Sequence, residues 1–103
     1  ERGNRLEEAL SMAKKAIEKE PENSSYLDTI GWIYFKLGEY KKAKTNIEQA
    51  IKLENTNATF LDHLGDVYSK MGNRSKAVEN WKKAFDMDPS KNELLKKIEK
   101  GEL

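Results

Sequence analysis

Apolar residues recur every three or four positions along the chain, and this spacing is typical of amphipathic helices. The breaking residues fall between the apolar runs. Gly38 and Gly72 each end a run, and glycine readily adopts the left-handed conformation found after helix ends. Pro21 and Pro89 end two further runs. We predict helices near 5–19, 24–37, 41–54, 58–71, 75–88 and 91–100, with Ser24 and Ser90 as N-caps and no strands.

Residues 24–57 and 58–91 are two copies of one 34-residue unit. Aligned without a gap, they share ten identities: Leu27/Leu61, Asp28/Asp62, Gly31/Gly65, Tyr34/Tyr68, Lys36/Lys70, Gly38/Gly72, Lys42/Lys76, Ala43/Ala77, Asn46/Asn80 and Ala50/Ala84. A fixed period of this length indicates a stacked array, in which each unit buries its apolar face against its neighbours.

The same frame predicts the domain organisation. A shift of one period aligns Leu95 and Ile98 with Leu61 and Leu64. We therefore expect a single domain made of the second helix of a partial repeat (1–23), two whole repeats (24–57 and 58–91) and a C-terminal capping helix (92–103). Because the chain begins with Glu1 and not with Met, we expect it to be a fragment of a longer protein.

Gly31 and Gly65 lie inside predicted helices, where glycine costs about 1 kcal/mol relative to alanine. We interpret both as points of close approach, at which the first helix of a unit rests on the small Ala43 or Ala77 of the second helix. Each unit would then be an antiparallel helix pair, and adjacent pairs would stack into a right-handed superhelix.

Composition narrows the possible functions. The 103 residues allow one domain at most. Charged residues make up 36% of the chain but balance to +1, so no bulk field recruits nucleic acid or an anionic membrane. No apolar run reaches the length of about 20 residues that a membrane span requires. The absence of cysteine excludes disulfides and thiolate sites but fits the cytoplasm and the periplasm equally, so the localisation stays open.

Catalytic and metal-binding patterns do not emerge. His63 is the only histidine, which excludes catalytic triads and multi-histidine metal sites. The glycines are isolated and form no phosphate-binding loop. Lysines make the last helix basic, but glutamates interrupt them, and we interpret this helix as a solvent-facing cap and not as a nucleic-acid site. We therefore expect no enzyme activity, no cofactor and no metal. Three glycosylation sequons, beginning at Asn23, Asn57 and Asn73, are interpreted as coincidental turn sequences.

The repeated residues carry a family resemblance. The second unit presents Leu61, Leu64, Gly65, Tyr68, Ala77, Trp81, Ala84 and Pro89, and the first presents Leu27, Ile30, Gly31, Tyr34, Ala43, Ile47, Ala50 and Asn55. This order resembles the tetratricopeptide repeat (TPR) pattern, with Leu replacing the opening Trp, Ile or Trp replacing the Phe, and Asn55 replacing the Pro. More narrowly, the segments LDTIGWIYFKLG and LDHLGDVYSKMG resemble C-terminal repeats of bacterial TPR proteins. The resemblance implies an all-α fold, an α-solenoid of antiparallel helix pairs that binds other proteins.

One set of positions on the first helix of each unit faces neither the partner helix nor the preceding unit. We call it the binding stripe, and the resemblance implies that it lines a concave groove that holds a peptide. It consists of Ser25, Asp28, Trp32, Phe35 and Lys36 in the first unit, and of Thr59, Asp62, Asp66, Ser69 and Lys70 in the second.

The composition of the binding stripe suggests its ligand. Trp32 and Phe35 are the kind of aromatic anchors that dominate interfaces, although Trp32 could instead pack against a preceding unit. The aspartates favour a partner with Lys or Arg. The alternative is a solvated face neutralised by Lys36 and Lys70. Family members that clamp the C-terminal carboxylate of chaperone tails carry basic residues here, so we do not expect this chain to bind such tails.

Two hypotheses about function remain. The first is a non-catalytic adaptor that holds a segment of a partner protein in its groove. The second is a structural array that stacks within a larger protein or self-associates through an uncovered apolar face on the first helix, formed by Leu6, Leu10 and Ile17. A third hypothesis, the regulatory arm of an enzyme encoded upstream, depends on sequence outside this chain.

Overall fold

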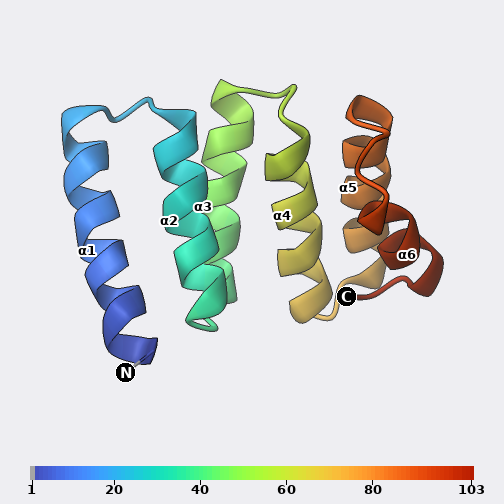
Figure 1. The fold of residues 1–103 in the computed structure, drawn as a ribbon, viewed down its shortest axis with the longest axis horizontal. Coiled ribbons are helices and arrows are strands. Elements are labelled where there is room, and N and C mark those ends of the chain that lie inside the picture. The colour runs from blue at the N-terminus through green and yellow to red at the C-terminus, as the bar shows by residue number, and fades with distance from the viewer. Residues whose placement is uncertain (1) are drawn as a thin grey trace. The chain divides into compact units, whose positions relative to one another are not determined.

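The computed structural model describes residues 2–103, with side chains from residue 5 onward, and every regular element in this range is a helix (Figure 1). The six helices are α1 (Arg2–Lys19), α2 (Ser24–Lys36), α3 (Tyr40–Leu53), α4 (Ala58–Lys70), α5 (Arg74–Met87) and α6 (Glu93–Lys100). The predicted boundaries agree closely, except that α1 begins earlier and α6 begins later than predicted.

The chain forms two compact units, residues 1–54 with α1 to α3 and residues 55–103 with α4 to α6. In the first unit α2 and α3 pack as an antiparallel pair, and α1 lies against α2 (Figure 1). In the second unit α4 and α5 form the equivalent pair, and α6 lies against α5. Gly38 and Gly72 turn the chain within each pair at φ values of 81° and 82°.

Glycines inside α2 and α4 close the two helix pairs, as predicted. Ala43 contacts Gly31 as predicted, but Ile47 lies closer to it, and Trp81, not Ala77, is the nearest residue to Gly65. A Cβ placed on Gly31 would lie 2.5 Å from Cγ1 of Ile47 and 3.0 Å from the carbonyl oxygen of Ala43. A Cβ placed on Gly65 would lie 2.4 Å from the indole ring of Trp81. The glycines therefore make room for a large side chain at the helix crossing, and not only for a neighbouring alanine.

Asparagine, and not serine, caps three helices. The Oδ1 atoms of Asn23, Asn57 and Asn73 each accept a hydrogen bond from a backbone N–H in the first turn of α2, α4 and α5, at 3.0, 3.2 and 3.2 Å. The prediction of Ser24 as an N-cap is wrong, because Ser24 lies within α2 and donates its hydroxyl to Glu54 at 2.6 Å. These three asparagines begin the three sequons, so capping gives the Asn a structural role.

Helix α6 differs most from the prediction. It begins at Glu93, and Ser90 is not its N-cap, because the Ser90 hydroxyl and N–H both donate to Asp88. Leu94 is fully buried, whereas Leu95 is 44% exposed and Ile98 is half-buried. The most buried residue of α6 is therefore not one that the repeat frame aligned with Leu61 or Leu64. Helix α6 therefore packs against α5 in a register of its own.

Candidate partner-binding site

In the first unit, the binding stripe carries a half-exposed aromatic stack on α2. The rings of Trp32 and Phe35 are 4.6 Å apart and inclined by only 9°. Phe35 also meets the ring of Tyr40, at the start of α3, at 5.6 Å and 56°. All three side chains are partly exposed to solvent. Such offset stacking prealigns the rings as a flat apolar surface at the edge of the helix pair.

Helical spacing explains how this surface forms. Residues three apart lie on the same side of a helix, which brings Trp32 and Phe35 together. The opposite side of α2 is buried in the unit through Leu27, Ile30 and Tyr34. Because the core residues hold α2 firmly, the aromatic stack sits on a rigid element.

The polar residues of this half of the stripe are placed differently from one another. Ser25 and Lys36 are exposed, whereas Asp28 is 7% exposed and counts among the buried polar residues. The sequence places all five residues on one arc of α2, and Asp28 is the member that the fold removes from water.

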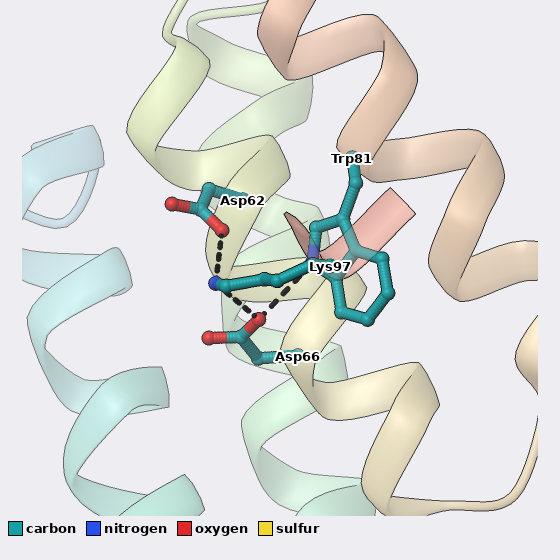
Figure 2. A network of polar contacts seen from close by, with 4 residues as sticks. All are labelled: Asp62, Asp66, Trp81 and Lys97. Carbon is teal, nitrogen blue, oxygen red and sulfur yellow. Dashed lines mark hydrogen bonds and ion pairs between the residues drawn. The ribbon is translucent and has the colours of Figure 1, made fainter. Parts of the chain in front are cut away.

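In the second unit, the binding stripe is engaged by the chain itself. Asp62 and Asp66 on α4 are buried, and Nζ of Lys97 on α6 lies 2.9 Å from Oδ1 of each (Figure 2). The Trp81 indole N–H donates to the same oxygen of Asp66 at 3.0 Å. The ammonium also lies 5.7 Å from the centre of the Trp81 ring. Of the remaining positions, Thr59 and Lys70 are exposed and Ser69 is half-buried.

Two carboxylates share one ammonium in this network, and burial and the neighbouring charges shift the pKa values of Asp66 and Lys97. Burial raises the pKa of Asp66 and the neighbouring Asp62 charge adds to the rise, while Lys97 and the Trp81 hydrogen bond oppose it. Burial by itself would lower the pKa of Lys97, but hydrogen bonds and charges from Asp62 and Asp66 outweigh burial, so the Lys97 pKa is raised. The Lys97 side chain therefore remains a charged ammonium at neutral pH.

The counter-ion of the α4 carboxylates was not predicted. The sequence left open two sources of positive charge, a basic partner or the chain's own Lys36 and Lys70. In the structure Lys36 and Lys70 are exposed, and Lys97 forms the ion pairs with Asp62 and Asp66. The sequence did contain a signal for this ion pair, because Lys97 follows Leu94 by three residues and so lies on the same side of α6. The repeat frame obscured it by assigning Leu95, and not Leu94, to the buried side.

The structure adds two further observations on candidate chemistry. Among the side chains described, those from residue 5 onward, no group of three or more His, Cys, Asp or Glu residues is arranged to hold a metal ion. No helix within residues 2–103 has the length and apolar character needed to cross a bilayer.

Comparison with protein families identifies the repeats. A model described as TPR repeat matches residues 31–72, and a model described as tetratricopeptide repeat matches residues 58–91, so the two together span more than half of the chain. The chain belongs to the tetratricopeptide repeat family. The second match has the same limits as the second copy found in the sequence. TPR repeats are generally non-catalytic modules of protein–protein interaction.

Solved structures of TPR proteins confirm the all-α helical repeat fold. A thermophilic TPR protein of Thermus thermophilus is 28% identical, with a TM-score of 0.87 over 96% of this chain and 50% of that protein. The first TPR of Spaghetti (RPAP3), solved with an HSP90 peptide, is 16% identical, with a TM-score of 0.91 over 97% of this chain and 79% of that one. The second likeness shows the fold alone.

Two further proteins resemble parts or all of this chain. The BBSome complex member BBS4 of Bos taurus is 47% identical over 38 residues, which cover 37% of this chain and 7% of that protein. An O-GlcNAc transferase mutant of Thermobaculum terrenum is 19% identical, with a TM-score of 0.88 over 93% of this chain and 18% of that enzyme. The chain therefore spans half or less of the Thermus, BBS4 and transferase chains.

Proposed function

We propose that this TPR chain is a non-catalytic adaptor that holds a segment of a partner protein against the binding stripe of α2. The observation that carries the proposal is the half-exposed stack of Trp32, Phe35 and Tyr40. Large aromatic side chains that a partner can cover are favoured as interface anchors, because each buries much apolar area with few rotamers to fix. The Trp32 and Phe35 rings stack on each other within α2.

The partner segment that fits this surface carries Lys or Arg. The aromatic faces attract a cation, by about 0.5–1 kcal/mol for an exposed pair. Asp28 adds negative charge beneath the surface. The second unit provides an internal precedent, since Lys97 is held there by carboxylates and by the face of an indole ring. On α2, Asp28 and the aromatic rings provide the same kinds of group, a carboxylate and aromatic faces, for a Lys or Arg of the partner.

The proposal assigns no catalytic step to the chain. Its lone histidine, His63, has no second histidine or cysteine with which to form a nucleophilic or metal site. The proposal concerns this chain alone. It does not extend to the bacterial origin that the repeat sequences suggested or to an enzyme in a longer protein.

Capture experiments with matched variants test the adaptor function. Trp32→Ala removes the main anchor, and Leu53→Ala removes an exposed apolar side chain of the same unit from α3 instead of α2. We expect Trp32→Ala to lose specific partners that the unchanged chain and Leu53→Ala both retain, with equal helix content by circular dichroism. Retention of every partner by Trp32→Ala would overturn the proposal.

Self-association is the second candidate, and one observation favours it. Met12 on α1 is 71% exposed, which is the highest value among the exposed large apolar residues. It lies on the same helix as Leu6, Leu10 and Ile17, which are only half-buried. Sedimentation equilibrium of the unchanged chain and of Met12→Ser separates the candidates. A dimer that weakens with Met12→Ser supports a structural role, and a monomer at all concentrations excludes it for this chain.

A further inference from the structure

Helix α6 is seated on the second unit by three distinct contacts. Leu94 is fully buried. Lys97 binds the α4 carboxylates at 2.9 Å, between Asp62 and Asp66 (Figure 2). At the end of the helix, Nη2 of Arg74 on α5 donates to the carbonyl oxygen of Lys100 at 2.7 Å. The surface beneath α6 thus offers an apolar socket, an acidic pair and a cation for a helix C-terminus.

These contacts define what the surface recognises. Leu94 and Lys97 are three residues apart, so both project from one side of α6. Arg74 meets the end of the helix, where carbonyl groups lack partners within the helix. A helix with Leu and Lys at this spacing, ending about one turn later, satisfies all three contacts.

Helix α6 is weakly ordered by itself. It has eight residues, and isolated helices shorter than about 12–15 residues are marginal in water. Its order therefore comes from the surface on which it lies. The segment between α5 and α6 is short and contains Pro89 and Ser90. The Ser90 hydroxyl donates to Asp88 within this segment and not to a residue of either helix.

We propose that this surface of the second unit is a receptor for amphipathic helices with a Leu-x-x-Lys pattern, and that α6 occupies it within the chain. A partner helix with the same pattern competes with α6. The inference rests on the proposed adaptor function, because it assigns a partner class to Asp62 and Asp66 of the binding stripe. A purely apolar helix would not substitute, since it would leave two buried carboxylates without a counter-ion.

The Trp81 indole N–H reports occupancy of the receptor, because it donates to the oxygen of Asp66 that also binds Lys97. The chain has two tryptophans, so Trp32 supplies an internal reference signal. The probe is a synthetic peptide of residues 89–103, titrated into full chains labelled at the indole nitrogens. The receptors are the unchanged chain, Lys97→Ser, and Lys97→Ser with Leu94→Ser.

We expect the peptide to bind the Lys97→Ser chains about tenfold or more tightly than the unchanged chain, and to return the Trp81 signal to its original position. A peptide with Lys97→Met should bind about tenfold less tightly. The difference between the two peptides should disappear when the receptor also carries Asp62→Asn and Asp66→Asn. If the chain with both Lys97→Ser and Leu94→Ser does not fold, the chain with Lys97→Ser alone keeps Leu94 and allows the same comparison of the two peptides.

Equal binding of the Lys and Met peptides, or a Trp81 signal that Lys97→Ser leaves unchanged, would overturn the inference. These outcomes are independent of the capture experiment with Trp32→Ala, which probes α2. If the peptide binds as expected while Trp32→Ala retains every partner, the receptor stands and the assignment of α2 fails. If the peptide does not bind as expected while Trp32→Ala loses its partners, the receptor is refuted and the adaptor function stands.

Discussion

Substitution of Gly65 by alanine should destabilise the protein, although alanine is the better helix former. The added Cβ would lie 2.4 Å from the Trp81 ring, whereas carbon atoms in optimal contact are about 3.5–4.0 Å apart. The ring must therefore move by roughly 1 Å or the helices must separate. Trp81 is fully buried and holds a hydrogen bond to Asp66, so it has no free space to enter.

The magnitude follows from three contributions. Overpacking a well-filled site costs about 1–3 kcal/mol. Loss of the Trp81 hydrogen bond to a carboxylate costs about 1.5–3 kcal/mol. The gain in helix propensity returns about 1 kcal/mol. The free energy of unfolding should therefore fall by about 1.5–5 kcal/mol for Gly65→Ala, and by more for Gly65→Leu.

Urea denaturation followed by circular dichroism and by tryptophan fluorescence measures this loss. Gly72→Ala serves as the control, because Gly72 has φ +82° and an added Cβ would meet nothing within 4 Å. Its cost comes from the backbone alone, about 1–2 kcal/mol. If Gly65→Ala were as stable as the unchanged chain, the assignment of a close helix crossing at Gly65 would be refuted.

Three further predictions follow from the caps and the ion pairs. Lys97→Met should cost about 2–4 kcal/mol at pH 7, somewhat below the range for a fully buried pair because Lys97 is partly exposed. The pKa of Asp66 is raised above 3.8, so its contribution to stability falls as the pH rises through the folded pKa. The Lys97→Met deficit in urea titrations should accordingly shrink at acidic pH, and a constant deficit would contradict the ion pair. Asn57→Ala should cost about 1 kcal/mol in the same assay through loss of the α4 cap, and no loss would contradict the cap. Ser90→Ala should return the lowered pKa of Asp88 toward 3.8 in an NMR titration, and an unchanged pKa would show that Ser90 is not its cause.

The repeat period predicted most of the fold, because both copies must place their helices, their turns and their close helix crossings at equivalent positions. Helix limits, the turn glycines and the need for close approach at Gly31 and Gly65 all follow from helical spacing and from the missing side chain. The group that fills the space depends on side-chain packing across the pair. For this reason Ile47 and Trp81 could not be distinguished from Ala43 and Ala77 as the contacting residues.

The candidate site was less predictable where the chain departs from its own repeat. The stacking of Trp32 on Phe35 follows from their spacing on one helix. The burial of Asp62 and Asp66 beneath Lys97 depends on how a short cap docks, and the repeat frame misplaced the buried side of α6. A carboxylate stripe in sequence therefore does not reveal whether its counter-ion belongs to a partner or to the chain.

Site-specific photo-crosslinking tests most directly whether a partner lies on α2. A photoreactive phenylalanine analogue at Phe35 preserves an aromatic ring in the stack, and the same analogue at the exposed Gln49 on α3 is the matched control. The proposed function predicts a crosslinked partner from position 35 that is absent from position 49 and is lost when Trp32→Ala is added. Equal crosslinking from both positions, or crosslinking only from position 49, would contradict it.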